Sequence, residues 1–378
     1  MAELPLITAP QRRARLALRH RLAPSERTDD VAAITDSLTA LHSADPVTPH
    51  LAAGMRMADP SIAAVEAALY EDRSVVRHHG MRRTLWVFTP ETTVDAHASS
   101  TIRVGNHELK RHLKMLDWEP SRFAEAVGEV ADLMSENPIS TKEVGGRLPY
   151  LNDRLTIGKG KSYETSISIL SWALLHAGFE GRTIRARPDS WNTSQYRWVA
   201  PWIGFPTEEG RHAGMLRRYL ERFGPATETD LFWWTGWNKT PIRKALAELE
   251  AVEVALEVGT GWVLPDDLDP AEEPEPWLAV LPGLDPTTMG WKERDWYLDP
   301  ALLPRVSDRN GNLGPTIWAD GRIVGGWAQR PDGEIAYELY EPVDESLLAV
   351  EIERLRALVG EDRFKHRFPS PNQKELLG

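Results

Sequence analysis

The sequence lacks cysteine entirely. This absence excludes disulfides, thiolate zinc sites and iron–sulfur clusters. The 11 histidines include no His-Glu-x-x-His and no other closely spaced ligand pattern. We therefore expect no metal and no cofactor, so any chemistry has to come from ordinary side chains.

Long apolar runs are also missing. No stretch approaches the roughly 18 uninterrupted apolar residues that a membrane span needs, and the N-terminus lacks a basic head followed by an apolar run. The 378 residues, 42% hydrophobic and 26% charged, have the balance of a soluble globular protein with roughly two to four packed units. We predict a cytoplasmic protein with no membrane partner.

Positive charge is in deficit, because the formal net charge is −12. Such a balance argues against a polyanionic partner, since binding phosphates requires Lys and Arg. The charges are segregated, however. Acidic residues gather at 266–275 and 341–353, whereas arginines gather at 12–21, 73–83 and 182–187. This distribution is compatible with one basic face on an acidic protein, and the alternative is that these clusters are solvated surfaces.

The clearest local pattern lies at residues 206–265. Apolar residues at helical spacing run from Met215 to Phe223, and two further helices are expected around 227–234 and 242–249. Two short strands, 252–256 and 262–264, then flank a Gly-Thr-Gly turn. Three helices and a hairpin are the order of a winged helix, whose third helix reads or braces a DNA groove.

The same order occurs twice upstream. In residues 121–205 we predict helices at 123–134, after 139–141 and from Tyr163 to His176, then a hairpin of strands 183–185 and 196–198. Residues 1–120 offer helices at 10–20, 30–41, 48–58 and 61–71, then strands at 75–79 and 84–88. Three such units side by side would form a concave cradle near the width of a duplex.

The pattern changes after an acidic, proline-rich linker at 265–276. Residues 277–378 contain short strands at 278–281, 316–319, 323–327 and 335–339, separated by turn sequences such as Asp320-Gly321. We expect a small β-barrel-like unit closed by an amphipathic helix at 347–358. The predicted fold class is therefore α+β: tandem winged-helix units, a C-terminal β unit and a terminal helix.

Five segments carry a resemblance to a known family. They are residues 41–46 (Leu-His-Ser-Ala-Asp-Pro), 81–86 (Met-Arg-Arg-Thr-Leu-Trp), 233–236 (Trp-Trp-Thr-Gly), 281–286 (Leu-Pro-Gly-Leu-Asp-Pro) and 320–327 (Asp-Gly-Arg-Ile-Val-Gly-Gly-Trp). Together they resemble the AlkZ/YcaQ-type winged-helix DNA glycosylases. The resemblance implies a monofunctional enzyme that hydrolyses the N-glycosidic bond of alkylated or crosslinked bases in duplex DNA.

The resemblance also indicates a catalytic motif. Characterised members carry Gln, an apolar residue, then Gln or Asp immediately before an Asp-Pro pair, and the corresponding residues here are His42, Ser43 and Ala44. His42 can still form one hydrogen bond to a water or a phosphate, whereas Ala44 has no polar group. Asp45 is the nearest carboxylate. We take His42 and Asp45 as catalytic candidates; the alternatives are a structural histidine and a helix cap.

Several residues are candidates for DNA contacts. Arg82, Arg83 and Thr84 are predicted on a strand beside the motif, where two guanidinium groups could bind phosphates. The hairpin around 327–333 would probe a groove. The remaining candidates are Arg185, Arg187, Gln329 and Arg330. The alternatives are solvated strand-edge arginines and an ordinary hairpin turn, and most of the 15 tryptophans should fill the core.

Two other functions fit the same sequence. One is a winged-helix DNA-binding protein without catalysis, either a regulator or a protein that shields lesions. The other is a resistance protein that sequesters a DNA-damaging small molecule in a cleft. We expect double-stranded DNA as the partner, a monomer as the oligomeric state, and association with the nucleoid when DNA is bound.

Overall fold

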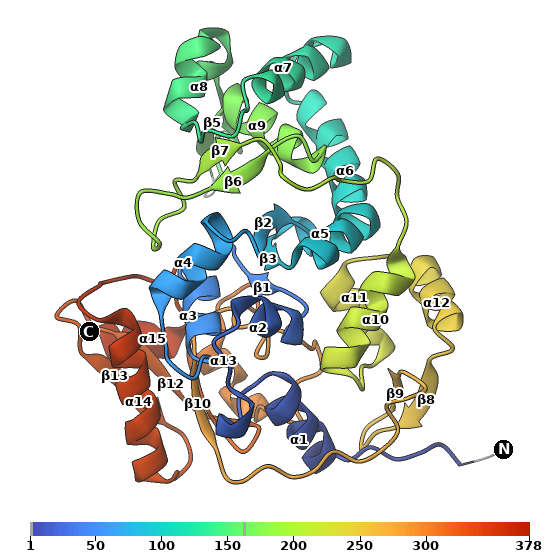
Figure 1. Cartoon of the computed structure of the whole chain (residues 1–378), viewed down its shortest axis with the longest axis vertical. Helices are drawn as coiled ribbons and strands as arrows, with labels where there is room; N and C mark the ends of the chain where they lie inside the picture. The colour runs from blue at the N-terminus through green and yellow to red at the C-terminus, as the bar shows by residue number, and fades with distance from the viewer. Residues whose placement is uncertain (1–2, 162–163) are drawn as a thin grey trace.

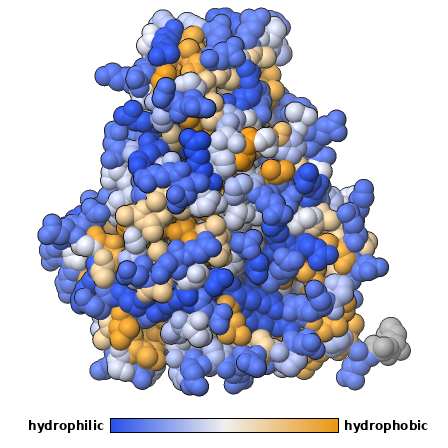
Figure 2. Space-filling view, viewed as in Figure 1, coloured by the Kyte–Doolittle hydropathy of each residue, from blue (hydrophilic) through white to orange (hydrophobic). Residues whose placement is uncertain are grey.

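The computed structural model describes residues 3–161 and 164–378. Figure 1 shows a wide base, built from the N-terminal, third and C-terminal segments, with the second segment standing above it. Within the described ranges no helix is long and apolar enough to cross a bilayer. Figure 2 shows that the visible face is largely hydrophilic, with hydrophobic side chains gathered in separate patches.

The N-terminal segment folds as four helices and a small sheet, in the predicted order. The elements are α1 (Ala9–Arg19), α2 (Val31–Ser37), β1 (Leu41–His42), α3 (Thr48–Gly54), α4 (Ile62–Tyr70), β2 (Val76–His79) and β3 (Leu85–Phe88). The side chains of Thr8, Asp30 and Ser61 cap helices α1, α2 and α4. The antiparallel sheet has the order β1-β3-β2. Helix α2 ends before the predicted residue 41 because Leu41 and His42 pair with β3 instead.

The connection to the second segment was not predicted. It consists of α5 (Pro90–Ala96), a π-helical turn (His97–Thr101) and α6 (Ile102–Leu113). In Figure 1 helix α6 rises from the base toward the upper segment. Short 3-10 turns also occur between other elements, at Pro24–Glu26, Met81–Arg83 and Pro149–Asn152.

The second segment departs from the prediction between its second and third helices. Its elements are α7 (Pro120–Asp132), α8 (Thr141–Arg147), β4 (Arg154–Ile157), β5 (Thr165–Ser168), α9 (Ile169–Phe179), β6 (Ile184–Ala186) and β7 (Arg197–Val199). The long helix predicted from Tyr163 begins only at Ile169, because Ser168 caps it and Thr165–Ser168 pairs with β4. Tyr163 itself lies outside the described residues. The hairpin predicted at 183–198 is confirmed as β6 and β7.

The third segment has the predicted winged-helix order. Its elements are α10 (His212–Phe223), α11 (Glu228–Thr235), α12 (Lys239–Glu248), β8 (Val252–Ala255) and β9 (Thr260–Val263). Thr227 and Asp230 form a capping box at the start of α11. Gly236 ends that helix with φ of 66°, a left-handed conformation that glycine adopts without steric cost. These local signals explain why the pattern was legible in the sequence.

The predicted C-terminal barrel is wrong. The elements are β10 (Leu278–Leu281), a 3-10 turn (Pro300–Leu302), α13 (Leu303–Val306), β11 (Thr316–Ala319), β12 (Arg322–Gln329), β13 (Ile335–Leu339), α14 (Glu345–Val359) and α15 (Pro371–Leu377). The strands form an open antiparallel sheet in the order β10-β11-β12-β13, and in the described part of the chain its outer strands do not pair. Four short strands are too few to enclose a packed interior.

Both faces of this sheet are covered instead. Leu348 and Ile352 of α14 share one apolar cluster with Val280 and Trp327. Trp318 belongs to a second cluster that continues into α1 and the third segment. The predicted helix at 347–358 is thus confirmed as part of α14, whereas α15 was not predicted. The C-terminal unit is therefore continuous with the base of the molecule.

A buried ion pair joins the N-terminal and C-terminal segments. Arg56, after α3, forms two hydrogen bonds of 2.8 Å with the carboxylate of Asp285, and both side chains are fully buried. Arg56 also donates to Thr287, and Thr48 donates to the carbonyl oxygen of Gly283 at 2.7 Å. The 281–286 segment, one of those that carry the resemblance, therefore has a structural role here.

Candidate active site and nucleic-acid interface

The predicted motif lies at the edge of the first sheet. His42 is opposite Trp86 in the β1–β3 pairing, and the Ser43 N–H donates to the carbonyl oxygen of Leu85 at 2.8 Å. The His42 ring meets the Trp86 ring edge-on, with centroids 4.7 Å apart. Strand pairing and an aromatic contact thus fix the position of a half-buried imidazole.

His42 is held in its neutral form. Burial lowers its pKa to about 3, and the charge of Arg82 contributes in the same direction. Its Nδ1 accepts a hydrogen bond from the Ala44 N–H at 3.4 Å. The proton of the neutral ring then belongs on Nε2, so His42 offers a hydrogen-bond donor to its surroundings. At neutral pH it cannot act as an imidazolium acid.

Both carboxylate oxygens of Asp45 accept hydrogen bonds from other parts of the chain. Oδ1 accepts from the Val47 N–H at 3.3 Å, and Oδ2 accepts from the Arg367 N–H at 2.8 Å and lies 3.3 Å from Nδ1 of His366. Burial alone would raise its pKa, but these hydrogen bonds lower it overall. The side chain is 2% exposed. Its catalytic role remains a prediction, and the geometry shows it docking the C-terminal segment against the motif.

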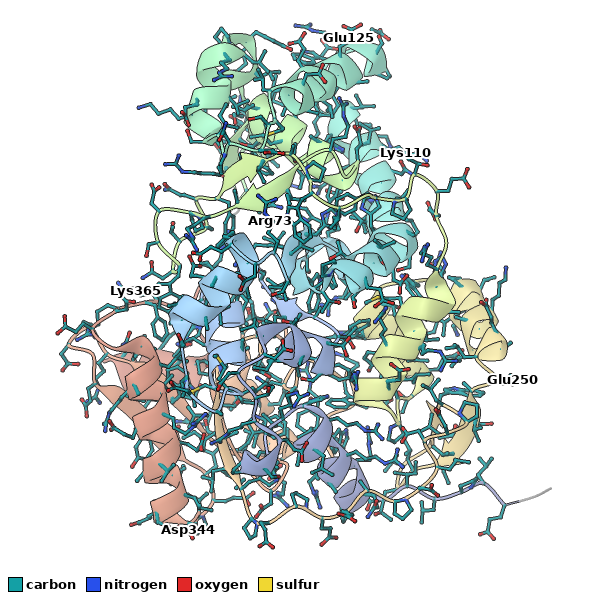
Figure 3. All side chains as sticks on the ribbon, viewed as in Figure 1. Arg73, Lys110, Glu125, Glu250, Asp344 and Lys365 are labelled. Atoms are coloured by element: carbon teal, nitrogen blue, oxygen red, sulfur yellow. The ribbon has the colours of Figure 1, made fainter. Side chains whose placement is uncertain are left out.

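Residues 363–368, the part of the C-terminal segment that contacts Asp45, were not identified from the sequence. Residues 363–368 read Arg-Phe-Lys-His-Arg-Phe, and exposed basic side chains alternate with buried Phe364 and His366. Arg367 also donates to the carbonyl oxygen of Ala44 at 3.3 Å. Figure 3 shows Lys365 at the left flank of the molecule. The alternation of basic and aromatic residues was a signal present in the sequence, and it brings exposed Arg367 to the motif.

The Arg82-Arg83 pair lies in a turn, whereas a strand was predicted. Residues Met81–Arg83 form a 3-10 turn between β2 and β3, in which Arg82 and Arg83 have φ of 56° and 61°. Left-handed backbone is costly for such side chains and often marks a functional site. Arg82 lies over the ring of Trp233 at 4.4 Å, and Arg83 forms an ion pair with Glu108 at 2.8 Å. Thr84 is half-buried; its hydroxyl donates to the carbonyl oxygen of Arg82, and its backbone bonds to Met81 and Gly80.

Arg185 and Arg187 lie on and beside β6 in the second segment. Arg185 lies 4.9 Å from the ring of Trp198 and 3.0 Å from Nε2 of His79, and burial lowers its pKa to about 10. Arg187 is exposed, but Glu66 and Glu71 form ion pairs with it. Arg187 therefore brings little uncompensated charge to a phosphate.

Arg77 links this second segment to the motif, and its role was not foreseen. The side chain is 2% exposed, and its Nε donates to the hydroxyl of Ser43 at 2.9 Å. Its guanidinium lies 4.6 Å from the ring of Tyr196 and donates to the hydroxyl of Tyr70. The sequence placed Arg77 in a basic cluster but gave no sign that it is buried behind Ser43.

Gln329 and Arg330 are at the end of β12, where the predicted hairpin is present. Gln329 is 6% exposed; its Nε2 donates to the carbonyl oxygen of Asp362 at 3.0 Å and its Oε1 accepts from the Phe364 N–H at 3.1 Å. Arg330 donates to the carbonyl oxygen of Leu376 at 3.0 Å. Both residues hold the C-terminal segment, so in this conformation Gln329 has no free polar atom for a DNA groove.

The site therefore gathers a neutral imidazole, an arginine turn and a basic segment at one sheet edge. Within residues 3–161 and 164–378, no three His, Asp or Glu side chains are grouped so that they could hold a metal ion. The geometry can donate hydrogen bonds and bind phosphates. It offers no free carboxylate beside His42 among the motif residues.

Comparison with known proteins defines the class. The sequence profile of the AlkZ-like DNA glycosylases matches residues 35–361, and the chain belongs to this family. The interstrand DNA cross-link repair glycosylase of Streptomyces sahachiroi is 24% identical over 272 residues, which cover 68% of this chain and 71% of that protein. The solved structure of Streptomyces sahachiroi DNA glycosylase AlkZ has a similar fold, with a TM-score of 0.76 and 20% identity over 96% of this chain and 99% of that one.

Proposed function

We propose that this protein is a monofunctional DNA glycosylase that releases alkylated bases, including crosslinked ones, from duplex DNA. Family membership supports a glycosylase acting on DNA. The single observation that favours catalysis at this site is the hydrogen bond from the Ala44 N–H to Nδ1 of His42, which leaves Nε2 of the neutral ring as a hydrogen-bond donor. Arg82, Arg83, Arg367 and Lys365 are then the proposed contacts to DNA phosphates.

The proposed chemistry depends on the leaving group. A base alkylated at a ring nitrogen is cationic, so its N-glycosidic bond breaks with little help from an acid. His42 would donate a hydrogen bond to a phosphate beside the lesion, whereas a hydrogen bond donated to the attacking water would only hold that water in place without making it more nucleophilic. A histidine whose pKa is about 3 is a weak base, so the departure of the cationic base has to supply most of the driving force. We infer that neutral bases are poor substrates.

The second candidate function is a non-catalytic protein that shields lesions. Two observations favour it: Ala44 has no polar group, and both oxygens of Asp45 are used within the chain. Such a protein would need the arginines but not His42. Base release is therefore the property that separates the two functions.

The test uses a duplex with one site-specific N7-alkylguanine, followed by alkaline cleavage at abasic sites. We expect strand cuts with the wild type, a loss of about a hundredfold in His42→Ala, and partial activity in His42→Gln, whose amide still donates a hydrogen bond. His107→Ala changes an exposed histidine of α6 and serves as the matched control. Tight binding of the duplex without any base release would reject the glycosylase and favour the shielding protein.

A further inference from the structure

A small basic hollow lies at the junction between the N-terminal segment and the second segment. Its volume is about 230 Å³, and its wall comes from the end of α4 and the start of β2 on one side and from β6, β7 and the 136–138 loop on the other. Figure 3 shows Arg73 at this junction, between the base of the molecule and the upper segment. The cations of the wall are Arg73, Arg77, Arg185 and Arg187, and Glu136 is the one carboxylate among the described residues that line it.

Arg73 is the cation of the hollow that a ligand can reach most directly. Its side chain is exposed and, within the described ranges, forms no hydrogen bond or ion pair. Its backbone has φ of 56°, a left-handed conformation that is costly for an arginine and often marks a functional site. An accessible, unpaired charge on strained backbone favours a role that uses the charge.

Two further cations of the hollow have no carboxylate partner. Arg77 is 2% exposed, and it donates to the hydroxyls of Ser43 and Tyr70. Half-buried Arg185 lies 3.0 Å from Nε2 of His79, and burial lowers the pKa of that histidine well below its usual range, so the contact adds no negative charge. Neither arginine forms an ion pair in the part of the chain that the structure describes. Because desolvated charges are normally paired, the arrangement favours an anion from outside the chain.

The accessibility of the cations determines how each one can act. Arg73 is free to donate hydrogen bonds to a bound anion. Arg77 is too deeply buried to be touched, so it acts only through its charge, which solvent and salt screen weakly in the interior. Arg187 is exposed, but Glu66 and Glu71 form ion pairs with it. The hollow therefore offers a free donor at its rim and uncompensated positive charge behind it.

We propose that this hollow binds a phosphate group. Arg73 donates to the phosphate oxygens, and Arg77 and Arg185 attract the group through their charges. A volume of about 230 Å³ holds a phosphate with the first carbon atoms of its ester, and it is smaller than the roughly 300 Å³ at which sites for drug-sized ligands begin. The phosphate belongs either to a DNA backbone or to a free phosphate compound. A DNA source rests on the proposed function, because it places a strand across the junction, whereas a free phosphate does not.

The first experiment tests a free phosphate on the DNA-free protein. It compares the midpoint of thermal unfolding, Tm, in sodium phosphate and in sodium chloride of equal ionic strength. We expect phosphate to raise Tm of the wild type by about 2 °C or more, because it binds the folded state. Arg73→Gln and Arg185→Gln should lose this increment. Glu136→Gln, which removes the opposing charge at an exposed position, should enlarge it, and misfolding cannot produce such a gain.

The matched control is Arg147→Gln. Arg147 is an exposed arginine of α8, and Figure 1 shows this helix at the top of the upper segment, away from the junction. A general effect of phosphate on protein hydration would be the same in all the variants. We therefore expect Arg147→Gln to keep the wild-type increment.

The second experiment tests a DNA source with an unmodified duplex, followed by fluorescence anisotropy. It requires no base release, so a failure of the proposed glycosylase activity leaves its outcome readable. If the phosphate is part of DNA, Arg73→Gln weakens binding and lowers the slope of log affinity against log salt by about 1, whereas Arg147→Gln changes neither. A phosphate-dependent Tm with unchanged duplex affinity assigns the hollow to a free phosphate. If Arg73→Gln and Arg185→Gln match Arg147→Gln in both experiments, the proposal is overturned.

Discussion

The surroundings of His42 determine which of its ring atoms can take part in chemistry. Nδ1 of the ring accepts a hydrogen bond from the Ala44 N–H, and burial lowers the pKa of His42 to about 3. The ring therefore stays neutral throughout the physiological range. A role that needs only the Nε2–H donor is compatible with this state, and a role that needs an imidazolium is not.

The pH dependence of base release follows from this pKa. Because His42 gains a proton only as the pH falls to about 3, its protonation state is constant from pH 5.5 to 9. We expect the single-turnover rate on N7-alkylguanine to show no inflection in that window. An inflection between about pH 6 and 7 that disappears in His42→Gln would show an ordinary histidine pKa and contradict the neutral-donor role.

Asp285 carries the negative charge of the buried ion pair that joins the N-terminal and C-terminal segments. Replacing it with Asn leaves the fully buried Arg56 guanidinium without its counter-charge. We expect a loss of about 3–5 kcal/mol in the free energy of unfolding, measured by urea denaturation. Asp266→Asn, at an exposed position, should change it by less than about 0.5 kcal/mol. A loss below about 1 kcal/mol in Asp285→Asn would mean that the pair contributes little.

At the scale of elements, the Met81–Arg83 turn combines two left-handed arginines with a position beside the motif. Asn accepts this backbone more readily than Arg does. In Arg83→Asn the relief of strain opposes the loss of the Glu108 ion pair, so we expect stability to stay within about 1 kcal/mol of the wild type. DNA affinity should fall, and the slope of log affinity against log salt should decrease by about 1.

The control for this turn is Arg111→Asn. Arg111 forms the other close ion pair with Glu108, at 2.6 Å, but lies in right-handed helix α6. The two variants therefore each remove one Glu108 contact. If both reduce DNA affinity and its salt slope equally, Arg83 has no special role as a phosphate contact.

The elements that sequence reasoning found are those with local signals. Helix α11 begins at the Thr227 capping box and ends at Gly236, so its limits follow from neighbouring residues. Strand β1 has two residues and exists only because it pairs with β3, more than 40 residues away in the chain. The β4–β5 hairpin precedes the apolar α9 directly, and periodicity alone could not separate them.

The site was predictable only in part, because some of its contacts join residues that are far apart in the chain. The resemblance to the family indicates His42, because the family's motif precedes an Asp-Pro pair, and the burial of the ring in the structure lowers its pKa. Arg367 meets Asp45 through a contact between opposite ends of the chain, which no local pattern encodes. Arg77 resembled a surface arginine in the sequence, yet strand β2 turns it inward against Ser43.

At the scale of the whole molecule, the protein is acidic, and its cations differ in whether a carboxylate is paired with them. The net charge is −12, and many arginines outside the motif are paired with carboxylates, as Arg187 is with Glu71. The charge of Arg82 acts on His42, and Arg367 contacts Asp45 and Ala44 of the same motif. If these cations contact DNA as proposed, we expect affinity for DNA to depend on them rather than on net charge.

The most direct measurement compares base release from two duplexes that differ only in one nucleotide. One carries cationic N7-methylguanine and the other carries neutral uracil, and single-turnover rates are measured with excess protein. If His42 acts as a neutral donor and the leaving group supplies the driving force, only N7-methylguanine is released. Release of uracil at a comparable rate, or release of neither base despite tight binding of both duplexes, would contradict the proposed mechanism.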